Sequence, residues 1–222
     1  MVKKSGFMGL PLTFIGGVIG FVAINIAMIC ILGAVLLYTC SPLKPYPINL
    51  FGYRTWIPGP NVGYSWTTQW ISDLGVGPSS YMFNIGLMVT GVLCIPFFPT
   101  LLEPLEYTKR AKLGVAVGLI AGMALIGIGA FPENTGVWHG LFSVIFWSLI
   151  AITAGILSSA MSQSTFFSKR LQRIGYFELA AGLVCLVLSG VFGSVPEWTM
   201  LFTLAVWVYA LSIEMLVKRK TL

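Results

Sequence analysis

The chemistry available to this sequence gathers around its single histidine. His139 follows a short polar stretch that contains Glu133, and Asp73 lies in an earlier stretch of the same kind. A histidine between two carboxylates can act as a general base, accept a proton or provide one ligand to a metal ion. We therefore take His139, Asp73 and Glu133 as the candidate catalytic residues. The competing interpretation, in which His139 hydrogen-bonds a carboxylate and locks two loops together, is favoured because no second diagnostic motif accompanies it.

Other polar and aromatic side chains are expected near His139, at the same face of the membrane. Ser143 shares a helical face with His139, because residues four positions apart on a helix lie one above the other. We take as candidate ligand-binding residues Asn84, Ser143, Trp70, Trp138 and Glu197. Burial of a carboxylate under a tryptophan-rich loop is costly unless the carboxylate finds a partner. We therefore expect His139 to face the protein interior, within hydrogen-bond or one-water distance of Asp73 or Glu133.

Several familiar chemistries are excluded. The four cysteines show no CxxC or other metal-binding spacing, so neither a disulfide framework nor a Cys/His zinc site is indicated. The sequence contains no GxxxxGK[ST], HExxH or GxSxG motif, which removes the usual nucleotide, zinc-protease and esterase signatures. A single histidine excludes bis-histidine haem ligation. We therefore predict no metal site and no cofactor.

The elements that position these residues must be membrane-spanning helices. Of the 222 residues, 57% are hydrophobic and 9% are charged, and the mean hydropathy is +0.89. A soluble domain carries about 25% charged residues. This deficit excludes a soluble globule, a coiled coil and an ordinary nucleic-acid-binding protein, and it leaves a protein embedded in a bilayer. We expect membrane lipids, and no nucleic acid, among its partners.

Charged residues divide the chain into six long apolar stretches. Each has close to the ~20 residues that an α-helix needs to cross ~30 Å of hydrocarbon. The predicted spans are residues 10–38, 81–102, 113–131, 139–161, 174–193 and 199–217. The sequence therefore predicts an all-α fold, a bundle of six transmembrane helices that forms one domain over residues 1–222.

Basic residues lie almost entirely on one side of these spans. Eleven of the 13 Lys and Arg residues precede span 1, separate spans 2 and 3, separate spans 4 and 5, or follow span 6. The other two, Lys44 and Arg54, lie on the opposite side. The positive-inside rule therefore places both termini in the cytoplasm of a multi-pass protein of the cell membrane.

The first outer loop, residues 39–80, is too long to be a simple connection. Trp66, Trp70 and Leu74 recur in it at four-residue spacing. Ser65 can cap the start of a helix and Gly75 can end it. We predict a short interfacial helix near residues 65–75, which covers something beneath it.

The second half of the chain contains an internal similarity. Four residues of the second outer turn recur 60 positions later: Trp138, Leu141, Phe142 and Trp147 match Trp198, Leu201, Phe202 and Trp207. Spans 3–4 and 5–6 are therefore predicted to be two copies of one helical hairpin, inserted in the same direction as a parallel repeat.

Small and ionisable residues inside the spans carry further expectations. Glycines at four-residue intervals, Gly114, Gly118 and Gly122, let helix backbones approach closely, so span 3 is expected to be the most enclosed. Glu214 precedes Lys218 by four residues, which predicts an ion pair along one helix. Glu178 lies about one turn inside span 5, and we expect it to pair with Arg173 or another basic side chain.

One set of motifs along the chain is similar to a known family. The motifs are Ser72-Asp73-Leu74-Gly75, Asn84-Ile85-Gly86-Leu87 with Gly91, Gly129-x-Phe131-Pro132, and His139 with Phe146. They resemble the six-span prokaryotic membrane proteins catalogued as domain of unknown function nine-nine-eight, and more distantly the Frag/DRAM/Sfk proteins. The resemblance implies a six-helix bundle with an outer polar site built from Asp73, Asn84 and His139. It supplies no activity, although the distant likeness hints at lipid handling.

Three classes of function remain open. The first is a non-enzymatic lipid-binding or assembly component, with partner subunits in a membrane complex; few polar groups and glycine-rich helix faces favour it. The second is an enzyme that acts on a lipid or polyprenyl headgroup at the outer leaflet, with His139 as acid or base and Asp73 or Glu133 orienting it. The third is a small-molecule or ion carrier. We favour the first.

Overall fold

The computed structural model describes residues 10–38, 46–49, 52–54, 63–67, 69–192 and 194–218. Its long helices are α1 (Leu12–Leu37), α2 (Ser80–Phe97), α3 (Lys109–Ala130), α4 (Val137–Met161), α5 (Lys169–Phe192) and α6 (Ser194–Val217). All six are long and apolar enough to cross a membrane. The predicted all-α class with six spans is confirmed.

Short elements lie between the long helices. The strands β1 (Tyr46–Asn49) and β2 (Gly52–Arg54) pair antiparallel, with Tyr46 opposite Arg54; this hairpin falls within the predicted outer loop and was not expected. The short 3-10 helices are η2 (Ile71–Gly75), η3 (Phe98–Leu101) and η4 (Glu133–Thr135). The η3 segment continues α2 past Pro96, which lacks the N–H group that an α-helix would use there.

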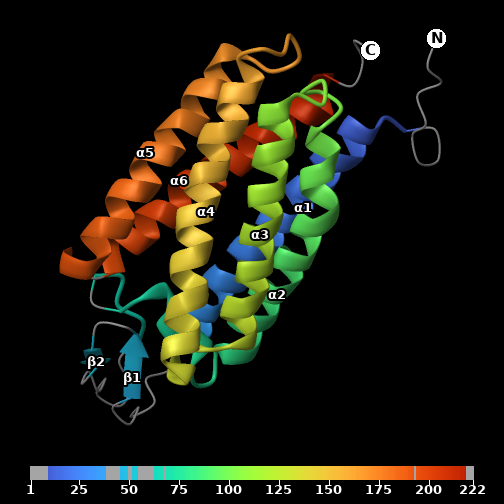
Figure 1. The fold of residues 1–222 in the computed structure, drawn as a ribbon. Coiled ribbons are helices and arrows are strands. Elements are labelled where there is room, and N and C mark those ends of the chain that lie inside the picture. The colour runs from blue at the N-terminus through green and yellow to red at the C-terminus, as the bar shows by residue number, and fades with distance from the viewer. Residues whose placement is uncertain are drawn as a thin grey trace.

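The helices form a closed ring in chain order. Each long helix packs against the next, and α1 closes the ring by packing against α6 (Figure 1). We call the end at which α1 begins and α6 ends the inner end of the bundle. The opposite end, which carries β1, β2, η2 and η4, is the outer end (Figure 1). The outer end is where the predicted site residues gather.

Close helix packing in α3 depends on its glycines. A Cβ atom on Gly118 would stand 2.5 Å from the ring of Phe98, and one on Gly122 would stand 2.7 Å from Cys94. Of the six spans, α3 has the largest buried share, 56%. The expectation that span 3 is the most enclosed is confirmed, because side chains of neighbouring helices occupy the space that its glycines leave.

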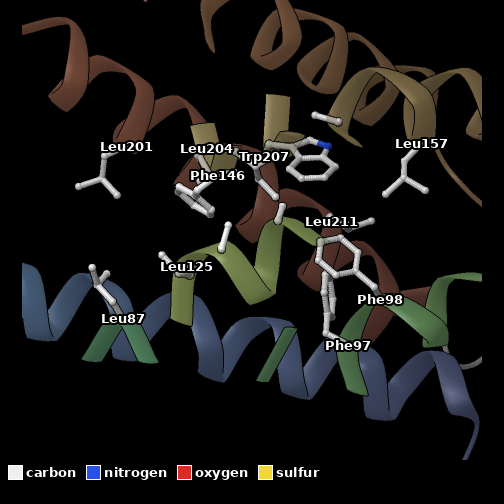
Figure 2. Packing of buried hydrophobic residues seen from close by; sticks show 14 of the residues in the cluster. Leu87, Phe97, Phe98, Leu125, Phe146, Leu157, Leu201, Leu204, Trp207 and Leu211 are labelled. Carbon is white, nitrogen blue, oxygen red and sulfur yellow. The ribbon is translucent and has the colours of Figure 1, made fainter. Parts of the chain in front are cut away.

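Large apolar side chains from several helices meet along the bundle axis. Figure 2 shows Leu201, Leu204, Trp207 and Leu211 following one face of α6, with Phe146 beside Leu204. On the opposite side lie Leu87, Leu125, Phe97 and Phe98 from α2, α3 and η3 (Figure 2). The core is therefore central and runs along the length of the helices.

The predicted helix near residues 65–75 is shorter than expected. Among the described residues of this stretch, 65–67 and 69–75, only Ile71–Gly75 is helical, and all five of its residues are buried. Trp66 is exposed while Leu74 is fully buried, so these side chains do not share one face. The physical reason is that hydrogen bonds to other helices, described below, hold this segment against the bundle in place of a regular amphipathic turn.

The two acidic residues within spans behave differently. The predicted pair forms, with Lys218 Nζ 2.8 Å from Glu214 Oε1. Glu178, in contrast, is buried, whereas Arg173 is exposed, and no ion pair joins them within the described part of the chain. The expected pairing of Glu178 is wrong, because residues five positions apart project from different sides of a helix.

Candidate functional site

An elongated cavity of about 110 Å³ lies inside the helix ring. Its walls come from α1, α2, α3, α4 and α6, and the part of α5 whose side chains are described contributes no lining residue. Small side chains on α1, Ala23 and Ala27, face larger ones such as Leu87, Phe146 and Leu204. An apolar cavity of this size stays dry and accepts apolar ligands.

The residues that line the cavity are spread along the bundle axis over about half of the ~30 Å of hydrocarbon that a bilayer presents. On α1 its lining extends from Gly20 to Ile31, and on α4 from His139 to Ile150. Eleven residues of α-helix measure ~16 Å. The lining residues on α1 and on α4 therefore give the same length for the cavity.

Polar side chains are concentrated at the outer end of the cavity. There the wall includes Ser72 from η2, His139 and Ser143 from α4, and Glu197 from α6. Farther inward the one hydroxyl-bearing lining residue is Thr90, whose Oγ1 donates to the carbonyl oxygen of Gly86 at 2.8 Å. The cavity is thus an apolar tube with a polar mouth.

His139 lies at this mouth with one ring nitrogen already bonded. Its side chain is 4% exposed, and Nδ1 lies 2.8 Å from the carbonyl oxygen of Phe131. Because a carbonyl oxygen only accepts, Nδ1 carries the hydrogen, and Nε2 of the neutral ring is left as an acceptor. The Asp73 carboxylate interacts with His139 electrostatically. The direct hydrogen bond to Asp73 or Glu133 that the sequence suggested is not formed among the described residues.

Two carboxylates bind backbone N–H groups here, Glu197 in the cavity wall and Asp73 in the neighbouring η2. Glu197 Oε2 accepts a hydrogen bond from the Ile71 backbone N–H at 2.7 Å, which ties α6 to η2. Asp73 Oδ2 accepts from the backbone N–H of Trp70, the residue before η2, at 2.8 Å. Both carboxylates are buried. Charge-assisted bonds of this kind are about twice as strong as neutral ones.

The described part of the outer loop that covers the mouth, residues 63–67 and 69–75, is the outer cap. Gln69 is its central hydrogen-bonding residue. The side-chain Nε2 of Gln69 donates to the Tyr38 hydroxyl at 2.8 Å, and its backbone carbonyl oxygen accepts from the Tyr64 hydroxyl at 2.9 Å. Trp198 Nε1 donates to the same Tyr64 hydroxyl at 3.1 Å. These bonds fasten the outer cap to α1 and α6.

Aromatic rings reinforce the same attachment. The ring of Trp198 on α6 lies 4.2 Å from that of Trp66 and 5.8 Å from that of Tyr64, measured between centroids. Ser194 Oγ also donates to the Trp66 carbonyl oxygen at 3.2 Å. Aromatic pairs at such distances add about 0.5–1.5 kcal/mol each beyond simple burial. The outer cap is thus held by packing as well as by hydrogen bonds.

The structure separates the predicted ligand-binding residues into two groups. Ser143 and Glu197 line the cavity with His139, as a shared site requires. Asn84 instead donates from Nδ2 to the Gly75 carbonyl oxygen at 3.0 Å and holds the end of η2 against α2. Trp138 is 57% exposed and contacts Phe131, with 6.2 Å between ring centroids.

The remaining predicted residues support the cap and its surroundings. Trp70 is half-buried and supplies the N–H group that Asp73 binds. Glu133 is buried within η4, which packs against η2 and β1. Within the described residues, no group of three His, Cys, Asp or Glu side chains is arranged to hold a metal ion.

Sequence reasoning did not anticipate the cavity or the part that Gln69 and Ser72 play at its mouth. A signal for the cavity was present in α1, where Gly20, Ala23 and Ala27 recur at helical spacing and line its wall. Small residues along one helix face let neighbours approach, and here they also leave room on the axis. Nothing in the local sequence singles out Gln69, because the bond that ties it to the helix bundle is made to Tyr38, 31 positions earlier in the chain.

Comparison with known proteins identifies one family. The family model described as "Protein of unknown function (DUF998)" matches residues 60–214. The matched region contains the whole outer cap, all of α2 to α5 and nearly all of α6. No curated protein and no solved structure matches the chain.

Proposed function

The chain belongs to the DUF998 family of proteins of unknown function, and from that premise we propose that it is a lipid-binding membrane protein that holds one hydrocarbon chain in its central cavity. The observation that carries this proposal is the shape of the cavity, an apolar tube of ~16 Å with polar groups at one end. A lipid has the same division between an apolar chain and a polar headgroup.

The polar mouth must decide which lipid binds. A hydrocarbon chain that moves from the bilayer into the cavity exchanges one apolar environment for another, so its transfer contributes little net free energy. Selectivity then comes from contacts between the headgroup and His139, Ser143 and Glu197. Of these, Glu197 already binds the outer cap, so a headgroup meets a preformed mouth.

We further propose the orientation of the protein. The excess of basic residues toward the inner end supports an orientation with both termini in the cytoplasm and the outer cap on the outer side of a prokaryotic cell membrane. The cavity mouth then opens toward the outer leaflet. The parallel repeat has further support, because α3 and α5 begin at Lys109 and Lys169, which are 60 positions apart, as are the matched tryptophans.

We propose a non-enzymatic role, as a lipid-binding component that associates with partner subunits in a membrane complex. The carboxylates at the mouth bind backbone N–H groups of the outer cap and its helix. These bonds make them structural clasps. Inward of Thr90 the cavity wall is apolar in the part of the chain that is described, which argues against an ion carrier.

Lipid retention after gentle extraction tests the proposal. The wild-type protein, purified in a mild detergent and analysed by native mass spectrometry, should carry one lipid. Ala27→Leu fills the cavity and should remove that lipid, whereas Ala116→Leu, on the exposed face of α3, should retain it. Equal retention by both variants, or no lipid on the wild type, would contradict the proposal.

One observation favours the second candidate, an enzyme that acts on a lipid or polyprenyl headgroup. The Phe131 carbonyl oxygen holds His139 in the form whose Nε2 can accept a proton. His139→Gln keeps hydrogen-bonding capacity but cannot take up a proton near neutral pH. If that variant folds and retains lipid but loses the biological activity of the protein, the enzyme is supported; full activity would leave His139 as a clasp.

A further inference from the structure

A second group of buried polar atoms lies where α4, α5 and α6 meet. Glu178 on α5 is 1% exposed, and Ser158 on α4 and Trp207 on α6 are fully buried. Glu178 Oε2, Ser158 Oγ and Trp207 Nε1 have no hydrogen-bond partner among the described protein atoms. Native proteins rarely leave buried polar atoms unpaired, so three in one helix interface require an explanation.

Gly175 on α5 brings two of these atoms to one place. The position that a Cβ atom would take on Gly175 lies 2.0 Å from Ser158 Oγ and 2.9 Å from Trp207 Nε1. The carbonyl oxygen of Ala154 lies 3.2 Å from the same position. Gly175 therefore lets Ser158 Oγ and Trp207 Nε1, beside the carbonyl oxygen of Ala154, approach the backbone of α5 more closely than any larger residue would allow.

Glu178 extends this group along α5. It follows Gly175 by three residues and so shares its helix face. Glu178 Oε1 lies 3.7 Å from the position of a Cβ on Gly182, beside Ala151 of α4, and Thr203 on α6 interacts with the carboxyl group. We call the group formed by Ser158, Gly175, Glu178 and Trp207 the α5 seam.

Among the described residues, no cation faces Glu178. Between His139 and Met161, α4 has no titratable side chain. On α6, Glu214 is paired with Lys218. The α6 side chain that interacts with the Glu178 carboxyl group is Thr203, which carries no charge. On α5, Arg173 is exposed, while Cys185 interacts electrostatically with Glu178. A carboxylate buried in a membrane without a cation is so unfavourable that it takes up a proton instead.

We propose that the α5 seam is an intramembrane binding site for water and a proton. Glu178 holds a proton on its carboxyl group, and water between the levels of Gly175 and Gly182 bridges that group to Ser158 Oγ and Trp207 Nε1. A buried water makes two to four hydrogen bonds, and the seam supplies three. Because Trp207 also lines the central cavity, its ring separates the seam from the cavity. In Figure 2 its indole nitrogen points toward the side of Leu157, the neighbour of Ser158.

Infrared difference spectroscopy of the protein in lipid nanodiscs at pH 7 tests the proton. The carbonyl stretch of a protonated carboxyl group should disappear in Glu178→Gln, with no loss in the carboxylate bands. Glu214→Gln is the matched control, because its ion-paired carboxyl group should lose carboxylate absorption instead. Loss of carboxylate absorption in Glu178→Gln would overturn the proposal. So would a wild-type spectrum without a protonated-carboxyl band, a measurement that requires no variant.

The water bridge is tested by the position of the same band. Ser158→Ala removes one partner of the bridging water, so it should shift the Glu178 carbonyl band, whereas Ser159→Ala, at the neighbouring hydroxyl that Arg110 binds, should not. An unshifted band in Ser158→Ala would contradict the water bridge. An equal shift in both variants would also contradict it. The site is independent of the lipid in the cavity, so failure of either proposal leaves the other standing.

Discussion

The two ends of the helix bundle use their polar residues differently. At the inner end, Glu214 pairs with Lys218 and accepts a hydrogen bond from the Ser168 backbone N–H at 3.0 Å. The Ser168 hydroxyl in turn accepts a hydrogen bond from the Leu171 backbone N–H at 3.2 Å. The backbone N–H groups at the start of α5 are thus bonded by side chains that remain partly exposed. At the outer end, Glu197 and Gln69 are buried; Glu197 connects α6 to the outer cap, and Gln69 connects the cap to Tyr38 at the end of α1.

This difference indicates what each end does. The inner contacts join residues that cap or neighbour the ends of helices, and their loss affects local stability. The outer contacts close a loop over the mouth of an apolar cavity, and their loss affects both stability and ligand retention. Substitutions at the two ends should therefore separate the two effects.

The largest effect is expected from Trp198→Ala at the outer end. Trp198 is 5% exposed and packs against the outer cap, so its truncation should cost about 3–5 kcal/mol. In thermal unfolding this corresponds to a lower Tm by roughly 10 °C. The matched control is Trp138→Ala, 60 positions earlier, whose exposed ring should cost less than about 0.5 kcal/mol. Equal Tm shifts in the two variants would contradict the difference in burial between Trp198 and Trp138.

A smaller effect is expected from Glu197→Ala. The change leaves the Ile71 N–H without its charged acceptor, a loss of about 1.5–3 kcal/mol, and it loosens the outer cap over the cavity. Bound lipid, measured by native mass spectrometry, should fall together with the Tm. Glu197→Gln keeps an acceptor oxygen and should be milder in both measurements. Full lipid retention in the alanine variant would show that the outer cap does not close the site.

The smallest effect is expected at the inner end, from Glu214→Ala. A partly exposed i,i+4 ion pair contributes about 0.3–0.5 kcal/mol, and the bond to Ser168 adds about 1 kcal/mol. The Tm should fall slightly while lipid retention stays unchanged, as measured on the same preparations. Loss of lipid in this variant would contradict the division between the two ends.

Much of the fold follows from the sequence because hydropathy is a local property. Each span contains enough consecutive apolar residues to require a helix in a bilayer. The Glu214–Lys218 pair is equally local, since it depends only on the spacing of two residues along one helix. His139 was found because it is the single histidine and lies at a span boundary.

The failures concern residues whose partners lie in other helices. Glu178 was expected to meet a basic side chain from its own end of the bundle, yet tertiary packing directs it toward Thr203. The helix near residues 65–75 was inferred from tryptophan spacing, but only Ile71–Gly75 is helical, because contacts with α1 and α6 override the local pattern.

The sequence by itself determined the number of helices, their boundaries to within a few residues and the end of the bundle at which the polar groups gather. These depend on the composition of short segments and on the length of a helix that crosses hydrocarbon. Only the tertiary structure decided that α5 stays outside the cavity wall, that Gln69 meets Tyr38 and that His139 bonds Phe131 before any carboxylate. Such contacts depend on how six helices rotate and pack against one another, and no single segment of the chain specifies that arrangement.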